Sequence, residues 1–430
     1  MPGPDGCGNF AGTARGAVLF QLKPQFTMLR YTLTFLLALT TSGLRAATLT
    51  IEGAVARAKQ SNPDLAAARF AVGEAYGRLL QSGRLANPEL ESELKPNVRG
   101  RQFTFGVGFI QRFPLTSRLR LERAVSGAEL KAAMAEVHNA ERLVAAEVRT
   151  LAVKMLAVQG LKALKETQRK NSVALAGEAA DSAKKGEGPA MVAVQFELEA
   201  SQLALELLQA DAESAALAGQ LRPLLGADSA ESVIVAGALA APAGTDKSVA
   251  VVENRADYQA TRAKAEAALT GIELAKAGRW ADASYGLSAE FQRAEDAPNG
   301  LENDGFIGFR FSLPLPLWNK NEGKIEEAKA AAARTAREAL ALALRIRAEA
   351  AAAQAEMNAA AKIAAQISTA LLPRAATVEE EFTKAQKQGQ AQMTEVLRAR
   401  EKRLGFEQSH LTALRDYHLA RVRLLAAQGR

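Results

Sequence analysis

Histidine and cysteine, the side chains that most often carry nucleophilic catalysis or bind transition metals, are scarce in this chain. The one cysteine is Cys7, and the three histidines are His138, His410 and His418. His410 and His418 are about two helical turns apart, too far for both rings to chelate one ion without a third ligand. The sequence contains no phosphate-binding loop and no nucleophile elbow. We therefore predict no enzyme activity, no cofactor and no resident metal.

Charged side chains recur at alternate positions in short segments. In one segment, glutamates alternate with Leu90 and Ser92. Around a pore, such carboxylates would form acidic rings that concentrate cations. Alternatively, they only solvate a wet surface, and arginines in the same pattern offset their charge. We favour the second interpretation. The charged positions are Glu89, Glu91, Glu93, Arg112, Glu290 and Arg310.

The elements that position these charges are predicted to be four β-strands. Large apolar groups alternate with small or polar ones in residues 89–94, 103–113, 285–292 and 307–313. This alternation fits a transmembrane barrel with a wet lumen, and it also fits a soluble sheet whose aromatic face packs on helices. In the barrel, the charged positions line the lumen. The lipid-facing positions are then Phe103, Phe105, Phe109, Tyr285, Phe291, Phe309 and Phe311.

The number of strands favours an assembly. Four strands cannot close a barrel around a pore, whereas three copies would supply about twelve. No apolar run after residue 46 is long enough for a transmembrane helix, so entry into a membrane would require strands.

Long helices occupy most of the remaining sequence. Residues 117–183 contain no proline, and a helix of that length would extend about 100 Å. Pro373 interrupts the corresponding stretch later in the chain, so a kink or break is expected there. Shorter helices should end at Asn87-Pro88 and near Gly278. Such long helices need partner helices along their sides.

An internal duplication organises these elements. Asn62-Pro63-Asp64-Leu65 has a partner near Asp257-Tyr258, and the Phe-Pro-Leu ending at position 115 has one in the Leu-Pro-Leu ending at position 315. Turns at Gly186-Glu187 and Gly389-Gln390 also correspond. We predict a first repeat at 47–226, a connector at 227–250 and a second repeat at 251–430.

The N-terminal residues indicate export. A basic start at Met28-Leu29-Arg30, an apolar core at 31–39 and a small-residue site before Ala47 form a secretory signal pattern. We expect Met28 to be the true start and residues 1–46 to be removed, which leaves a chain without cysteine, as suits an oxidising periplasm. The formal net charge of the whole chain is +7, but no basic block with interleaved aromatics exists, so no nucleic acid partner is expected.

Three stretches resemble motifs of a known family. Residues 48–52, followed by Asn62-Pro63-Asp64-Leu65, resemble the opening signature of the TolC-like outer-membrane efflux proteins. Residues 221–226 resemble the close of that family's first repeat. Residues 311–323, Phe-Ser-Leu-Pro-Leu-Pro-Leu-Trp-Asn-Lys-Asn-Glu-Gly, resemble the second-repeat motif of the CzcC-like branch, which serves heavy-metal efflux. The resemblance covers essentially all of residues 47–430.

The resemblance implies a fold and partners. It implies a mainly α chain with four strands, in which tandem long-helix hairpins build a trimeric α-barrel in the periplasm below a shared β-barrel in the outer membrane. The homotrimer would receive substrate from an inner-membrane pump of the resistance-nodulation-division type through a periplasmic adaptor. The family's adaptor-contact tip corresponds to Gly186, Glu187, Gly389, Gln390 and Glu395.

One departure from the family pattern affects this tip. Val192 and Pro189 replace the family's acidic and serine positions in the first repeat, which puts that repeat's adaptor contact in doubt. The same departure could instead indicate a particular adaptor. Two alternatives for the whole protein remain: a duct for drugs or secreted polypeptide, and a soluble periplasmic coiled-coil protein that is adaptor-like or chaperone-like.

Overall fold

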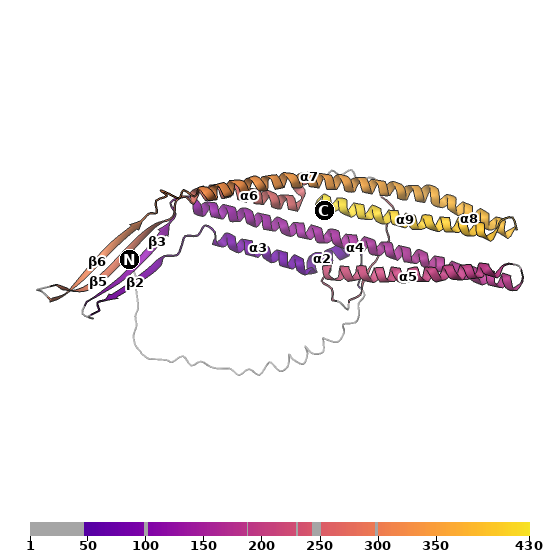
Figure 1. The fold of residues 1–430 in the computed structure, drawn as a ribbon, viewed down its shortest axis with the longest axis horizontal. Coiled ribbons are helices and arrows are strands. Elements are labelled where there is room, and N and C mark those ends of the chain that lie inside the picture. The colour runs from indigo at the N-terminus through magenta and orange to yellow at the C-terminus, as the bar shows by residue number, and fades with distance from the viewer. Residues whose placement is uncertain (1–46, 99–101, 187, 229–230, 243–250, 297–299) are drawn as a thin grey trace, which may run out of the picture. The chain divides into compact units, whose positions relative to one another are not determined.

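The computed structural model describes residues 47–98, 102–186, 188–228, 231–242, 251–296 and 300–430 (Figure 1). The predicted signal segment 1–46, Glu187 and part of the predicted connector 227–250 lie outside the described residues. The description below concerns the unit that begins at Ala46.

Both halves of the described chain contain the same succession of elements: a helix, two strands, a long helix and a returning helix. The first half contains α2 (Ile51–Ser61), α3 (Pro63–Gln81), β2 (Glu89–Pro96), β3 (Phe103–Phe113), α4 (Arg118–Lys184) and α5 (Ala190–Leu224). The second contains the short helical turn η1 (Val252–Asn254), α6 (Ala256–Ala277), β5 (Ala283–Asp296), β6 (Gly300–Ser312), α7 (Glu322–Gln366), η2 (Ile367–Leu371), α8 (Leu372–Lys387) and α9 (Met393–Ala427).

Local sequence explains several helix ends. The Asn62 side chain accepts a hydrogen bond of 2.9 Å from the Leu65 backbone N–H and so caps α3, whose first residue, Pro63, has no N–H to satisfy. Gly278 is the C-cap of α6, as predicted. The expectation that α3 extends to Asn87-Pro88 is wrong. The helix ends at Gln81, and the chain turns at Gly83, whose φ is +69°.

The long helix of the second repeat is interrupted as expected. α7 ends at Gln366, and the π-helical turn η2 separates it from α8, in which Pro373 is among the first residues. Proline lacks an N–H, and its ring clashes with the carbonyl four residues earlier; a π turn relieves both conflicts without ending the helix. In the first repeat α4 is continuous over 67 residues.

The four predicted strands form one antiparallel sheet in the order β2-β3-β5-β6. The strand pairs of the two repeats meet where β3 pairs with β5. β6 begins at Gly300, earlier than the alternating pattern at 307–313 indicates. A second sheet was not predicted: β1 (Ala47–Leu49) pairs in parallel with β4 (Val233–Val235) of the connector.

Small side chains allow the helices to pack closely. α4 packs against α2, α3, α5, α6 and α9, while α7 packs against α6 and α9. The principal buried cluster joins α2, α4 and α5 to β4; it includes Val148, Leu221, Leu225 and Val235. A second cluster between α7 and α9 combines three buried alanines with Met357, Tyr417 and Leu424. Of the described helices, none is both long and apolar enough to cross a membrane.

Candidate functional site

The strand register collects the predicted apolar positions on one face of the sheet. Phe105 is paired with Phe291, and Leu287 lies between Phe109 and Phe309. Tyr285 is paired with Phe311, and their ring centroids are 5.1 Å apart. All seven predicted lipid-facing residues therefore share this face, which we call the aromatic face. It consists of the odd-numbered positions of β3, β5 and β6 and the even-numbered positions of β2.

The aromatic face is not covered by the rest of the described chain. Phe309 is 73% exposed and Ile307 is 85% exposed. An exposed sheet of aromatic and branched side chains is a large unpartnered apolar surface. The interpretation in which this face packs on helices of the same chain is therefore wrong. That the face contacts lipid remains a prediction.

The opposite face carries all six predicted lumen positions. Arg112 forms an ion pair with Glu89 at 2.9 Å, and Arg310 approaches Glu91 at 4.0 Å. Glu93 is paired with Lys95 on its own strand at 2.8 Å. These side chains are 49% to 73% exposed, so each pair adds little stability. Their pairing gives this polar face a mixed charge, which agrees with the solvation interpretation better than with an acidic ring.

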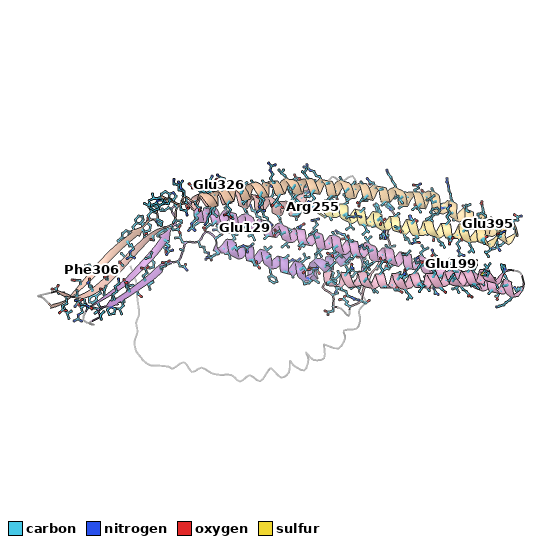
Figure 2. The ribbon with its side chains drawn as sticks, in the orientation of Figure 1. Glu129, Glu199, Arg255, Phe306, Glu326 and Glu395 are labelled. Carbon is cyan, nitrogen blue, oxygen red and sulfur yellow. The ribbon has the colours of Figure 1, made fainter. Side chains whose placement is uncertain are left out.

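Glycines keep this polar face shallow at its centre. Glu91, Gly108, Ser288 and Gly308 lie side by side across the four strands. A Cβ added at Gly308 would lie 2.7 Å from the Ser288 hydroxyl. Glu290 lies between Gly106 and Phe306, the one aromatic residue on this face within the described strands; Figure 2 labels Phe306 on the sheet.

Each predicted tip glycine occupies a left-handed turn. Gly389 has a φ of +73° and Gly186 one of +77°. At the end of α8, the Gly389 N–H donates to the Gln386 carbonyl at 3.0 Å, and the Gln390 N–H donates to the Ala385 carbonyl at 2.9 Å. This is the Schellman pattern that ends a helix at glycine. No atom lies within 4 Å of where a Cβ would sit on either tip glycine, so both turns are open.

Glu395 has a structural role at this tip. Its carboxylate accepts a hydrogen bond of 3.1 Å from the Gln392 backbone N–H, and together these two residues form the capping box of α9. Figure 2 shows Glu395 beside the α8–α9 turn. At the start of α5, Pro189 is the N-cap and makes no side-chain cap bond. The sequence difference between the repeats is thus also a difference in helix capping, which the family pattern alone did not reveal.

A buried charge cluster joins four helices. Arg255, at the start of α6, contacts Asp257 at 2.5 Å and Glu349 of α7 at 2.8 Å. Arg142 of α4 lies 3.8 Å from Asp257 and donates a hydrogen bond of 2.8 Å to the Ala426 carbonyl of α9. Burial raises the pKa of Asp257, but the hydrogen bond and charge of Arg255 outweigh it, so the pKa is lowered overall. The cluster fixes the helices relative to one another, and no sequence pattern indicated it.

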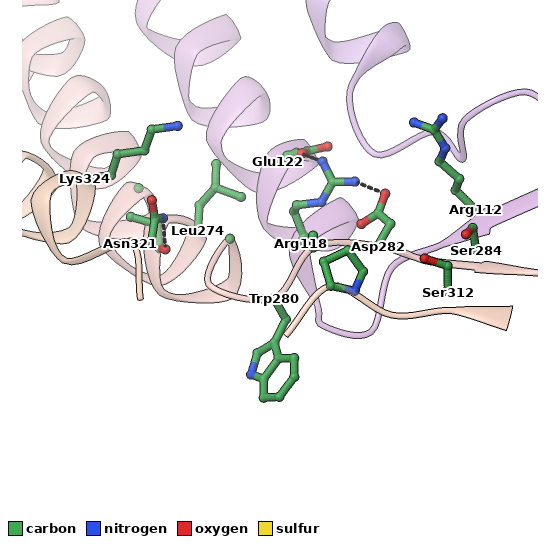
Figure 3. A pocket seen from close by; sticks show the side chains of 15 residues that line it. Arg112, Arg118, Glu122, Leu274, Trp280, Asp282, Ser284, Ser312, Asn321 and Lys324 are labelled. Atoms are coloured by element: carbon green, nitrogen blue, oxygen red, sulfur yellow. Dashed lines mark hydrogen bonds and ion pairs between the residues drawn. The ribbon is translucent and has the colours of Figure 1, made fainter. Parts of the chain in front are cut away.

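The junction between sheet and helices contains an open cleft of about 800 Å³. Arg118 at the start of α4 bridges Glu122 at 3.0 Å and Asp282 at 2.7 Å (Figure 3). The Thr116 hydroxyl donates to the Ala277 carbonyl at 3.1 Å, and the Asn321 amide donates to the Ala275 carbonyl at 2.7 Å. The loops that link strands to helices are therefore tied to the end of α6.

The histidines do not converge on a common site. His418 Nε2 lies 2.9 Å from the Ala240 carbonyl, and burial lowers the pKa of this histidine. His410 Nδ1 is buried without a hydrogen-bond partner in the described part of the chain. Across the described ranges, no group of three His, Cys, Asp or Glu side chains is arranged to hold a metal ion.

Comparison with known proteins identifies the fold. No family model and no curated protein matches the sequence, whereas several solved structures match. CusC superposes with a TM-score of 0.73 at 15% identity, covering 88% of this chain and 92% of that one; its crystal structures concern folding and transmembrane channel formation. VceC, an outer membrane protein of Vibrio cholerae, gives 0.70 at 20% identity, with 88% and 96% covered. The MtrE outer membrane channel of Neisseria gonorrhoeae gives 0.70 at 15% identity, with 91% and 93% covered. The chain therefore has the fold of these outer-membrane channels.

Proposed function

We propose that this chain is the outer-membrane channel subunit of a tripartite efflux system. One observation carries the proposal: a single sheet presents an uncovered aromatic face on one side and a charged, glycine-containing face on the other. Lipid on one side and water on the other satisfy both faces at once. The fold shared with solved outer-membrane channels supports the same assignment, as does the signal pattern predicted from the sequence.

The assembly proposed is a homotrimer. β2 and β6 are the edges of the four-stranded sheet. Unpaired backbone groups at a sheet edge are costly in lipid, and four strands are too few to enclose a lumen. Pairing β2 of one copy with β6 of the next, three times over, would remove every edge and give twelve strands. The helices would then continue as a tube on the periplasmic side.

The tips of the two hairpins are proposed to meet a periplasmic adaptor that links the channel to an inner-membrane pump of the resistance-nodulation-division type. The turns at Gly186 and Gly389 are open, and the capped start of α9 presents the Glu395 carboxylate at the surface. Gln390 follows Gly389, and its N–H completes the turn at the end of α8. An exposed, well-defined turn is a suitable docking element because its backbone is already ordered.

Heavy-metal cations are the proposed cargo. The support is the resemblance of residues 311–323 to the CzcC-like motif, together with a polar face on which carboxylates are already paired with basic groups. Paired carboxylates would let cations pass without holding them. Drugs or secreted polypeptide are the alternative cargo, and the growth assay described next distinguishes drugs from metal cations.

The experiment has two parts. Purified mature chain should form a detergent-dependent trimer, because the aromatic face needs an apolar solvent. A monodisperse monomer in buffer without detergent would refute the channel and favour the adaptor-like alternative. In cells that carry a matching pump and adaptor, deletion of the protein should then sensitise growth to toxic metal cations. Sensitivity to drugs alone, with a normal trimer, would keep the channel but overturn the proposed cargo.

A further inference from the structure

The loop between β6 and α7, residues 313–321, exposes two large apolar side chains that the first repeat lacks. Leu317 is 62% exposed and Trp318 is 93% exposed. The corresponding loop of the first repeat, residues 114–117, is shorter and contains neither a second leucine nor a tryptophan. Apolar side chains displayed in this way indicate a surface that another molecule covers.

The loop is held in this arrangement by contacts with its own chain. The Leu317 N–H donates to the Leu315 carbonyl at 2.9 Å. Asn321 ends the loop in a left-handed conformation with a φ of +61°, and its side-chain amide donates to the Ala275 carbonyl of α6 at 2.7 Å. Because the loop is already ordered, its apolar side chains can dock on a partner with little loss of conformational entropy.

The loop lies on one of two open sides of the described unit. β6 is one edge of the four-stranded sheet, and β2 is the other. The helices follow the same division, since α7 packs along α6 and α9 whereas α3 packs along α4. One open side is therefore formed by β6 and α7, and the other by α3 and β2. These are the two sides that the proposed trimer brings together.

Strand direction determines which segments would meet there. β6 runs towards the helices and ends at Ser312, whereas β2 starts at Glu89, directly after the α3–β2 linker, residues 82–88. Antiparallel pairing of β6 with β2 of the next copy therefore brings the β6–α7 loop beside that copy's α3–β2 linker. The end of α3 and the linker expose Leu80 and Leu85, each about half exposed. Apolar groups are thus present on both sides of the seam.

A junction of this kind already exists once inside the chain. The pairing of β3 with β5 brings the loop 114–117 beside the α6–β5 linker, residues 278–282. There the Thr116 hydroxyl donates to the Ala277 carbonyl at 3.1 Å, and Arg118 contacts Asp282 at 2.7 Å (Figure 3). Because both halves of the chain have the same succession of elements, the seam between copies should repeat this junction with the longer loop.

We propose that Leu317 and Trp318 of one copy pack on Leu80 and Leu85 of the next copy. We call this contact the junction latch. It is continuous with the β2–β6 pairing, and it removes from water apolar side chains that the described chain leaves exposed. The inference rests on the proposed trimeric channel and deepens it by naming the side chains that join neighbouring copies where the sheet meets the helices.

Cysteine cross-linking tests the latch directly. The only natural cysteine, Cys7, lies in the segment that we expect to be removed, so an introduced pair reports one contact. Trp318→Cys with Leu85→Cys, in the exported full chain, should form disulfides on mild oxidation. Bonded cysteines have Cα atoms within about 7 Å of each other, whereas strand spacing separates β2 and β6 of one chain by roughly 14 Å. The disulfides should therefore join copies, and denaturing gels should show covalent dimers and trimers.

Two controls accompany this variant. Trp318→Cys with Leu269→Cys should give no covalent dimers, because Leu269 is comparably exposed but belongs to α6, which lies between α4 and α7. Trp318→Ala should lower the temperature at which the detergent-solubilised trimer dissociates by several degrees, whereas Trp318→Phe should largely preserve it, since phenylalanine keeps most of the apolar contact. Light scattering in detergent measures the size of each variant separately.

The outcomes are distinct. A trimer that forms no covalent dimers with Trp318→Cys and Leu85→Cys would overturn the latch and leave the channel standing. Quenching of Trp318 by a brominated detergent in a Trp280→Phe trimer would show that lipid covers the loop, and would also overturn it. Covalent species larger than trimers would mean that the contact does not close into a ring, which refutes it too. Monomeric protein in detergent would overturn both proposals, whereas a covalent trimer supports the latch.

Discussion

Replacement of Gly389 by valine separates folding from coupling at the tip. Gly389 has a φ of +73°, a conformation that glycine adopts freely and a β-branched residue adopts with difficulty. Nothing lies within 4 Å of where its Cβ would sit, so the substitution strains the backbone without crowding a neighbour. The α8–α9 turn should therefore open or rearrange while the rest of the chain folds normally.

The expected cost can be bounded by comparison with Gly226. A non-glycine residue in the left-handed region costs about 1–3 kcal/mol, and at Gly389 there is no steric addition. The hairpin behind the turn is held by ion pairs from Glu379 to Arg403 at 2.5 Å and to Arg400 at 3.9 Å, so the loss should stay local. Gly226 has a φ of +59°, but a Cβ there would lie 2.3 Å from the Ser61 carbonyl oxygen. Gly226→Val must therefore disrupt the packing of α2 on α5.

The assay pairs trimer yield with resistance to toxic metals in cells that carry the pump. Gly389→Val should give normal trimer and no resistance, and Gly226→Val should lose both. Gly389→Asn should keep both, because asparagine tolerates the left-handed region. Gly186→Val, with an equally open turn, should reduce resistance less if the second-repeat hairpin carries most of the adaptor contact. Full resistance with Gly389→Val at normal yield would refute the reasoning that this turn docks the adaptor.

Three further predictions follow from named contacts. Glu395→Gln keeps the α9 capping box but removes the carboxylate charge, whereas Glu395→Ala also removes the capping box, at a cost of about 1 kcal/mol of helix stability. If Glu395 makes a charged contact with the adaptor, both variants should lose metal resistance. If capping is its sole role, only Glu395→Ala should lose it. Phe109→Asp and Phe309→Asp should each block insertion into vesicles, measured by flotation, because a charge on the lipid-facing side costs on the order of 2 kcal/mol per chain. Gly108→Asp, on the polar face, should still insert. Equal insertion of all three variants would show that the faces are assigned wrongly. The lowered pKa of Asp257 means that its stabilising contribution is present above about pH 4, the unfolded value, and is lost as pH falls through the folded value. Asp257→Asn should cost about 3 kcal/mol near neutral pH, because it removes the carboxylate that Arg255 and Arg142 share and leaves Arg255 paired with Glu349 alone. The variant should also flatten the acid dependence of denaturant unfolding, and an unchanged acid profile would contradict this.

The strand faces could be predicted from the sequence because their cause is local. Side chains in a strand alternate between two faces, so the positions of Phe109, Phe309 and Arg112 followed from spacing alone. The register then confirmed that each repeat contributes to the same aromatic face. The left-handed turns at Gly186 and Gly389 and the break before Pro373 were likewise predictable, since each depends on one residue's backbone preference.

Tertiary structure alone decided the contacts between distant segments. The parallel pairing of β1 with β4, the ion pair from Arg57 to Glu231 at 2.5 Å, and the cluster around Arg255 join residues that are far apart in the chain. No local period records such neighbours, because they depend on how the helices pack after the duplication folds. The same holds for the loop at Trp318: the sequence showed a motif, but only the fold revealed that its apolar side chains are exposed. Burial and exposure result from packing between elements, and they cannot be obtained from a pattern within one element.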